Sequence, residues 1–118
     1  MATGRDLQQP GTGDPWRVAA DVLGHLADPT RLRLLYLLRT EQDVSSLTAQ
    51  VDASRSSVSQ HLGRLRLAGL VQARRDGRRM CYRLTSDHLA HLVDEALQFA
   101  DHDVHGVPHH RDGAGQTT

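Results

Sequence analysis

The chain has 118 residues, of which 38% are hydrophobic, and its formal net charge is zero, which suits one domain with a modest core. No apolar run approaches the roughly 18 residues of a membrane span, and the first residues lack the apolar stretch of a signal peptide, so we expect a cytoplasmic protein. The single cysteine, Cys81, excludes an intrachain disulfide framework and a cysteine-rich zinc site.

Charge is distributed unevenly along the chain. Between Ser54 and Arg83 there are eight arginines and one acidic residue, a balance of +7, whereas the other residues carry six arginines and thirteen acids, a balance of −7. A basic segment in an otherwise acidic chain is typical of proteins that bind a polyanion. The alternative is a solvated arginine surface, and the local motif has to decide between the two.

The first part of the chain predicts a disordered lead and a helix. Residues 1–14 have no hydrophobic periodicity, so we expect them to be disordered. Helical periodicity begins at Pro15, which suits a first helical turn. The apolar residues on one face of this helix are Trp16, Ala19, Ala20, Leu23 and Leu26.

Two further helices are predicted before residue 52. The first has Asp28 as N-cap and Pro29 at its first position. The residues expected to face the core are Leu32, Leu35, Tyr36 and Leu38. A short helix over SSLTAQV follows, for which Ser45 or Ser46 is the expected cap.

The stretch SRSSVSQHLGRLRLAG predicts a fourth helix. Ser54 is its expected N-cap, and Gly69 stands where a left-handed residue often ends a helix. Its predicted buried residues are Val58, Leu62 and Leu65, and a different face, which is left free, holds Ser57, Gln60 and Arg64.

After this helix the period changes from helical to two. Two strands are expected around Asp76-Gly77, a dipeptide typical of hairpin turns, with an arginine pair on either side. A last helix is expected from Ser86, with Leu89, Leu92, Val93, Ala96 and Phe99 as its apolar residues. Beyond it we expect a flexible tail over residues 106–118, so that the folded domain spans residues 15–105.

Two short helices followed by an arginine-tipped hairpin form a winged helix-turn-helix, a mainly α fold with a small β-hairpin, in which Ser54–Ala68 is the recognition helix. Small serines at its start let the backbone approach phosphates, Gln60 can bind an adenine edge, and Arg64 can bind guanine or a phosphate. Hairpin arginines would hold the wing against the DNA backbone or minor groove. The predicted DNA contacts are Ser54, Ser56, Ser57, Ser59, Gln60, Arg64, Arg74, Arg75, Arg78 and Arg79.

The segments LADPTRLRLLYLL and SRSSVSQHLGRLRLAGLVQARRDGRRMCYRL resemble the ArsR/SmtB family of metal-responsive repressors, over about residues 16 to 105. The resemblance implies a winged-helix homodimer whose first and last helices form the dimer interface, and whose partner is an inverted-repeat DNA operator. It also places His61 beside the core, where a packed histidine is expected. An enzyme is not expected, because the chain shows no nucleophile–base set and no phosphate-binding loop.

The resemblance also suggests which metal sites to consider. Cysteine-based members of the family carry CVC where this chain has DVSSL, so Asp43 and Ser45 replace the thiolates and soft-metal sensing is not expected. Cys81 is expected to pack as a small hydrophobic residue. Another site type in the family lies on the last helix as Asp-x-His and His-x-x-His. Here His88 and His102 match, while Ser86 and Phe99 replace the other two ligands.

The stretch ADHDVHGVPHHRDG supplies further ligands and resembles the nickel/cobalt branch of the family, the NmtR/KmtR type. His88 and His102 are fourteen residues apart, about 21 Å along one helix, so they can share an ion only across antiparallel helices of a dimer. Imidazole and carboxylate without sulfur suit nickel, cobalt, zinc or copper, and the surplus of donors favours six-coordinate Ni(II) or Co(II), with Zn(II) as the alternative. The expected ligands are His88, Asp101, His102, His105, His109 and His110.

Several alternatives stay open in the sequence. His91 can join the metal site or be a solvated helix residue, and His25 is expected to be structural. The histidine tail can instead store or handle metal while DNA binding is independent of it, which a deletion after Gly106 would reveal. The operator sequence, the direction of the metal effect and a partner protein that supplies ligands are also open.

Overall fold

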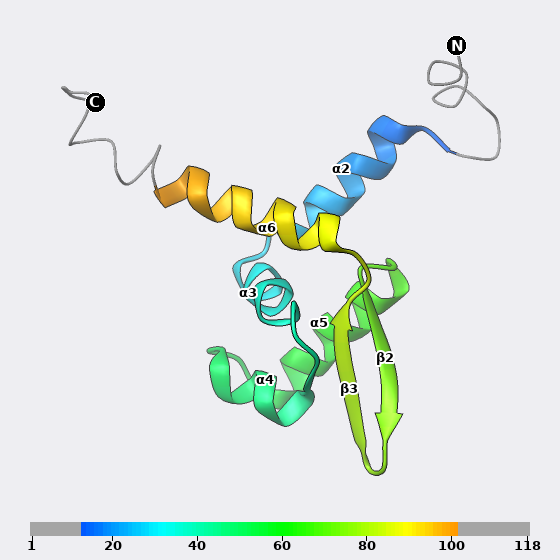
Figure 1. Ribbon diagram of the computed structural model, residues 1–118, viewed down its shortest axis with the longest axis vertical. Helices are drawn as coiled ribbons and strands as arrows, with labels where there is room; N and C mark the ends of the chain where they lie inside the picture. The colour runs from blue at the N-terminus through cyan, green and yellow to red at the C-terminus, as the bar shows by residue number, and fades with distance from the viewer. Residues whose placement is uncertain (1–12, 102–118) are drawn as a thin grey trace.

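The computed structural model describes residues 13–101. Residues 1–12 of the predicted lead and the whole predicted tail, together with His102 and His105, lie outside the described residues. The described part forms five helices and one three-stranded sheet (Figure 1). In chain order these elements are α2 (Pro15–Leu26), α3 (Pro29–Leu37), β1 (Gln42–Asp43), α4 (Val44–Gln50), α5 (Arg55–Leu67), β2 (Val71–Asp76), β3 (Arg79–Leu84) and α6 (Asp87–Phe99).

Most helix starts are those that the sequence predicts, because each has an oxygen-bearing side chain just before its first turn. Asp28 accepts a hydrogen bond from the Arg31 N–H at 2.9 Å. In the same way Ser54 accepts from the Ser57 N–H, and Ser86 from the His88 N–H, both at 3.0 Å.

The cap of α4 differs from the prediction. Neither Ser45 nor Ser46 caps this helix; Asp43 does, by accepting from the Ser46 N–H at 2.8 Å. Asp43 has the extended backbone of an N-cap because it ends β1, and the two serines therefore fall inside the first turn.

The core lies between α3, α4, α5 and α6. Its fully buried side chains are Leu34, Leu35, Leu38, Leu47, Val58, Leu62, Leu65 and Val93. The predicted core face of α3 is wrong in one respect, because Leu34 is buried there and Tyr36 is exposed. Tyr36 lies at the surface, where the Arg39 guanidinium is 4.4 Å from its ring centroid in a cation–π contact.

The sheet contains a strand that the sequence analysis missed. Its order is β1-β3-β2, and both pairings are antiparallel. Residues 42 and 43 are too few to show an alternating pattern, so pairing with β3 is what makes them a strand. The hairpin turn is also one residue later than predicted: Asp76 pairs with Arg79, and Gly77 with Arg78 forms the loop, where Gly77 has a φ of +65°.

Two backbone hydrogen bonds attach the hairpin to the helical core. The Leu84 N–H donates to the Leu38 carbonyl after α3 at 2.9 Å, and the Leu70 N–H, just before β2, donates to the Leu65 carbonyl of α5 at 2.9 Å. The result is a molecule with two different ends, with α2 and α6 at one and the hairpin tip pointing towards the other (Figure 1). Within residues 13–101, no helix is long and apolar enough to cross a membrane.

Candidate nucleic-acid interface and metal-ligand positions

Helix α5 has a buried face and a free face, as a recognition helix requires. Val58, Leu62 and Leu65 are completely buried against the core, which fixes the rotation of the helix about its axis. The predicted DNA-contacting residues on the rest of its surface are exposed, apart from Ser57, which is half-buried: Ser54, Ser56, Ser59, Gln60 and Arg64. The structure therefore leaves these polar side chains accessible to a ligand.

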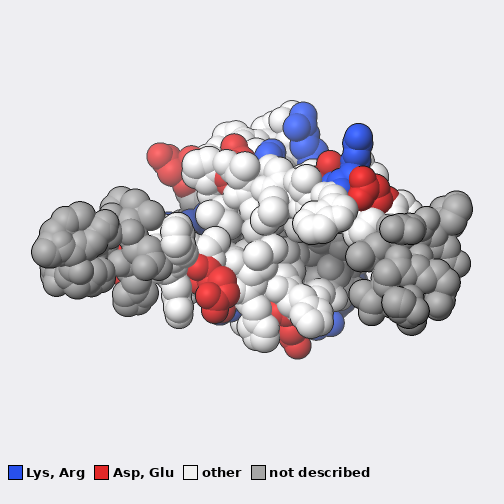
Figure 2. Space-filling model, turned by 90° about the horizontal axis from the view of Figure 1, so that it is seen from above, with Lys and Arg blue, Asp and Glu red and all other residues white. Residues whose placement is uncertain are grey.

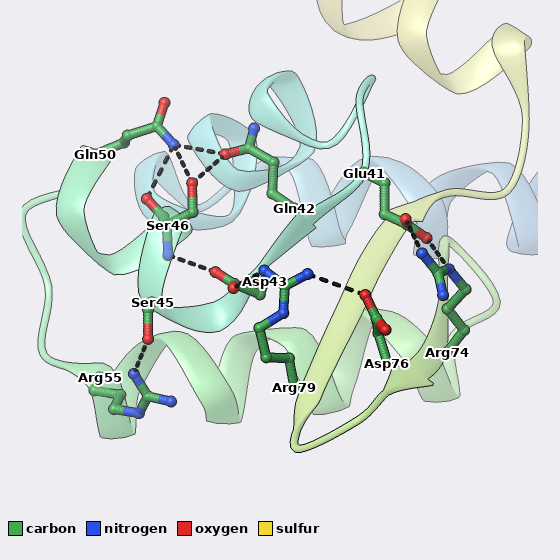
Figure 3. A network of polar contacts seen from close by, with 10 residues as sticks. All are labelled: Glu41, Gln42, Asp43, Ser45, Ser46, Gln50, Arg55, Arg74, Asp76 and Arg79. Atoms are coloured by element: carbon green, nitrogen blue, oxygen red, sulfur yellow. Dashed lines mark hydrogen bonds and ion pairs between the residues drawn. The ribbon is translucent and has the colours of Figure 1, made fainter.

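The start of α5 is attached to α4 by polar contacts (Figure 3). The Arg55 guanidinium donates to the Ser45 hydroxyl at 2.7 Å. Ser46 donates to the Gln42 side chain at 2.8 Å, and the Gln50 amide donates to the same oxygen at 2.6 Å. Ser45, at one of the positions where thiolate sensors have cysteine, therefore helps to hold the two helices of the helix-turn-helix together.

The hairpin is the predicted wing, and its four predicted DNA contacts, the wing arginines, are Arg74, Arg75, Arg78 and Arg79. In the described part of the chain, two of them form ion pairs with acidic residues and two do not. Arg74 makes two parallel contacts with Glu41, of 2.7 and 2.8 Å, and Arg79 contacts both Asp43 and Asp76 at 3.0 Å (Figure 3). Within residues 13–101, neither Arg75 nor Arg78 has an acidic partner. Glu41 and Asp43 were not among the predicted site residues, because only the pairing of β1 with β3 brings them to the wing.

The ion pairs shift the acid–base equilibria of their members. The Arg74 guanidinium lowers the pKa of the Glu41 carboxyl. For Asp43, the Ser46 backbone N–H lowers the pKa most, and Arg79 adds to the effect. The carboxylates of Asp76 and Asp43 in turn raise the pKa of Arg79. Each shift favours the charged form, so these pairs are ionised at neutral pH.

The histidines that the structure describes do not form a metal site within one protomer. His88 is exposed at the first turn of α6, and Asp101 is exposed just beyond its far end. No group of three or more histidine, cysteine or acidic side chains that could hold an ion occurs in residues 13–101. The other predicted ligands, His102, His105, His109 and His110, lie outside that range.

The remaining residues of interest from the sequence are three histidines and the single cysteine. His61 and His25 are half-buried, and His91 is exposed on α6. The pKa of Asp28 is lowered mainly by the Arg31 N–H that it caps, and the charges of Arg31 and His61 lower it further. Cys81 is a buried free cysteine.

The end of the molecule formed by α2 and α6 exposes many apolar side chains, and much of its surface carries no charged residue in the view from above (Figure 2). Six of the eight large hydrophobic residues that are exposed in the described part lie on these two helices: Trp16, Val18, Leu23, Leu92, Leu97 and Phe99. Trp16 is 79% exposed and Phe99 is 62% exposed. Such a concentration of exposed apolar side chains is typical of a protein–protein interface.

Comparisons with known proteins agree with this architecture. Residues 28–73 match the family described as "Bacterial regulatory protein, arsR family". The transcriptional regulator KmtR of Mycobacterium tuberculosis is 42% identical over 99 residues, which cover 83% of this chain and 76% of that protein. The transcriptional repressor SmtB of the same organism is 40% identical over 87 residues, or 73% of this chain and 64% of SmtB.

A solved structure supports the fold. The homodimeric winged helix-turn-helix DNA-binding domain Mb0332 from Mycobacterium bovis, described as a possible ArsR-family transcriptional regulator, superposes with a TM-score of 0.70 at 30% identity. The match covers 82% of this chain and 91% of that domain. The relatives are transcriptional regulators and not enzymes. The fold, the two-ended arrangement and the extent of these matches lead to one conclusion: the chain belongs to the ArsR family of DNA-binding transcriptional regulators.

Proposed function

We propose that this protein is a homodimeric, metal-responsive regulator that binds an inverted-repeat operator, and that Ni(II) or Co(II) at the last helix and tail modulates its DNA affinity. The observation that carries the proposal is the apolar face of α2 and α6, which includes Trp16 and Phe99, at the end opposite the hairpin tip. A dimer formed through that face leaves both recognition helices free and points them away from the interface.

DNA binding by such a dimer follows from general geometry. Two recognition helices related by a two-fold axis can enter successive major grooves about one helical turn apart. Ser54 and Ser56 at the start of α5 are exposed, and the N-terminal turn of a helix is where phosphates bind favourably. Gln60 is exposed on the next turn and is the predicted base contact.

The dimer interface is tested by placing a charge on the apolar face. Phe99→Glu, combined with Leu23→Glu, is expected to give a monomer in light scattering at micromolar concentration and to weaken binding to an inverted repeat. Leu67→Glu is the matched control, since Leu67 is 91% exposed but lies on α5. A monomeric mass for the unaltered protein with operator DNA present would contradict the proposed architecture.

His88 and Asp101, the two proposed ligands within the described residues, lie too far apart in one chain to share an ion and would suit a metal shared between two protomers. The His88 backbone N–H is satisfied by the Ser86 hydroxyl, and the imidazole is at the surface on the first turn of α6. Asp101 is exposed at the other end, thirteen residues away, so about 20 Å of helix separates the two. Imidazoles and carboxylates without sulfur bind Ni(II), Co(II) and Zn(II) well. A bound ion would bridge two chains and so bias the shape of the dimer.

The proposed ligand set consists of His88 from one chain with His102 and Asp101 from the other, completed by His105, His109 and His110 of the tail. Because the imidazoles must be neutral to bind, metal affinity is expected to fall as the pH drops through about 6.5. Ni(II) or Co(II) is favoured over Zn(II) because the tail offers more donors than a tetrahedral ion needs.

The experiment is a titration of one labelled operator duplex with the protein, with and without Ni(II), Co(II) or Zn(II). His88→Ala and His102→Ala should each abolish the metal response and leave metal-free DNA binding unchanged. His91→Ala is the control, because His91 is also an exposed histidine of α6. Loss of the response in His91→Ala but not in His102→Ala would overturn the ligand set.

A variant truncated after Gly106 distinguishes a metal-sensing role of the tail from a metal-storage role. A sensor that uses the tail loses its Ni(II) response when the tail is removed. A regulator whose tail only stores metal keeps whatever response it had. An equal response to Zn(II) with and without the tail would favour a zinc-responsive repressor instead.

A further inference from the structure

Acidic residues that precede the recognition helix lie against the wing. Asp43 is opposite Cys81 in the β1–β3 pair, and Arg74 is opposite Cys81 in the β2–β3 pair, so these side chains share one face of the sheet. Cys81 lies between them and is only 4% exposed. At the tip of the same face Asp76 is opposite Arg79. Carboxylates and guanidinium groups therefore cover this face of the wing (Figure 3).

We propose that Glu41 and Asp43 are positioning residues that brace the wing against the helix-turn-helix through Arg74 and Arg79, and that Arg75 and Arg78 are the wing arginines that contact DNA phosphates. This inference rests on the proposed function only in assuming that the wing touches DNA. It divides the four predicted wing contacts into two bracing residues and two binding residues.

The contacts of Arg74 and Arg79 occupy the groups that a phosphate would need. Arg74 uses Nε and Nη2 in two parallel hydrogen bonds to the two oxygens of Glu41, which is the geometry in which arginine also grips a phosphate. Arg79 uses Nη1 for Asp43 and Nη2 for Asp76. Either residue would have to release a carboxylate before it could bind DNA in the same way.

Asp43 connects the brace directly to the helix-turn-helix. Its Oδ1 accepts from the Ser46 N–H at the start of α4, and its Oδ2 accepts from Arg79 in the wing. Because α4 in turn contacts Arg55 at the start of α5 through Ser45, the orientation of the wing is linked to that of the recognition helix.

The strand pairing alone provides little to hold the wing tip. β1 pairs with β3 over only two residues, so within the described chain the hairpin beyond Cys81 has no third strand and no backbone hydrogen bond to a helix. A two-stranded hairpin is marginally stable in water, and exposed ion pairs add little to global stability. The effect of the brace is therefore expected in the orientation of the wing and not in the unfolding of the domain.

A bracing role for Glu41 and simple charge attraction predict opposite changes in DNA affinity when Glu41 is neutralised. The cluster of four wing arginines with Glu41, Asp43 and Asp76 has a small net positive charge, and neutralising an acid increases it. If only charge mattered, Glu41→Gln would tighten DNA binding. If Glu41 braces the wing, Glu41→Gln weakens specific binding, because the order that the brace supplied must then be imposed during binding.

The decisive experiment is a charge swap measured on the operator duplex over a series of salt concentrations. Glu41→Arg and Arg74→Glu are each expected to weaken binding severalfold. The double variant restores the pair with the same net charge and should return to within about twofold of the unaltered protein. A double variant that stays as weak as Arg74→Glu would overturn the proposal, because it would mean that Arg74 contacts DNA itself.

The salt dependence gives a second readout. Arg78→Ala should reduce the slope of log affinity against log salt by roughly one unit, whereas Arg74→Gln should lower affinity with little change of slope. Asp52→Asn is the control for charge, since it removes an exposed acid from the turn between α4 and α5 without breaking an ion pair within the described residues. It should leave binding unchanged or slightly tighter.

Hydrogen exchange of the DNA-free protein tests the brace even if the proposed function fails. Glu41→Gln with Asp43→Asn should speed exchange of the β2 and β3 amides near the turn and leave the α5 amides unchanged. Unaltered wing exchange would overturn the brace, whatever the DNA measurements show. Conversely, a braced wing in a protein that binds no duplex would contradict the proposed function alone.

Discussion

Some single side chains of this protein have two structural roles, and Asp43 is the clearest case. One of its oxygens caps α4 and the other contacts the wing. Sequence patterns assign caps by position along the chain, so they favoured the serines that follow. The pairing of β1 with β3 gives Asp43 the extended backbone of a cap, and it also places Arg79 within reach.

Substitutions at Asp43 should separate the two roles. Asp43→Asn keeps an N-cap, because asparagine caps about as well as aspartate, but it loses the ion pair with Arg79. Asp43→Ala loses both, so its melting temperature should be lower than that of Asp43→Asn. An equal loss in both variants would mean that the cap contributes nothing.

The lowered pKa of Asp43 gives this residue a predicted pH dependence. A carboxyl whose pKa is lower in the folded protein stabilises the fold above its ordinary value of 3.8, and the contribution is lost as the pH falls through the lowered value. Asp43→Asn should therefore make the melting temperature less dependent on pH below about 4. Above pH 5 the two proteins should show parallel profiles.

Two glycines, one inside α5 and one just after its end, should respond to alanine with opposite effects on stability. Gly63 is inside the helix, and an added Cβ would meet nothing within 4 Å, so Gly63→Ala should stabilise the protein by about 0.5 to 1 kcal/mol. Gly69 has a φ of +81°, so Gly69→Ala should destabilise it by about 1 kcal/mol. Urea unfolding of the two variants measures both effects, and a destabilised Gly63→Ala would contradict the helical geometry at that position.

At the scale of elements, some helices bury their apolar face in the core of the protomer and others leave part of it exposed to solvent. α5 is fully supported by its own protomer, because Val58, Leu62 and Leu65 are completely buried. α2 and α6 are not, since each packs one side against the protomer and exposes large hydrophobic residues on the other. These two helices carry the face that the proposed dimer would bury.

A pair of leucines on α5 measures how much the helix contributes to the core. Leu62→Ala removes a completely buried side chain and should destabilise the protomer by about 2 to 5 kcal/mol. Leu67→Ala is the control on the same helix, and its effect should stay within about 0.5 kcal/mol because Leu67 is exposed. Similar losses in the two variants would mean that the assigned rotation of α5 is wrong.

The molecule as a whole separates its apolar end from its wing tip, and residues 39–43, which follow α3, contact both. Arg39 in the turn after α3 forms an ion pair with Asp94 of α6, and Glu41 and Asp43 further along contact the wing. If α6 moves in the proposed dimer, these few residues are the shortest path of contacts from it to the wing. This short connection is consistent with a regulator whose last helix controls DNA affinity.

Mixed dimers test whether the proposed metal site joins two chains. One subunit carries His88→Ala and the other carries His102→Ala. If His88 of one chain binds with His102 of the other, both lesions fall in the same site, so each mixed dimer should retain one strong Ni(II) site. Two equally damaged sites would place both histidines of a site in one chain.

Much of the fold could be predicted from the sequence, because its helices carry local signals. Caps such as Asp28 and Ser54, the glycine at position 69 and the regular spacing of Val58, Leu62 and Leu65 act over a few residues, so the helical pattern of the winged helix-turn-helix is visible in the chain itself. The basic segment and the polar face of α5 are likewise local properties, and together with the winged helix-turn-helix pattern and the family resemblance they indicated DNA binding.

What depends on contacts between distant residues could not be predicted in this way. The two-residue strand β1 exists because β3 pairs with it, and only that pairing brings Glu41 to Arg74, 33 positions along the chain. The sequence marks all four wing arginines alike as basic residues beside a turn. Their division into two that are paired with acids and two that are not follows from side-chain geometry across the sheet, because the energy of an ion pair depends on distance in space and not on separation along the chain.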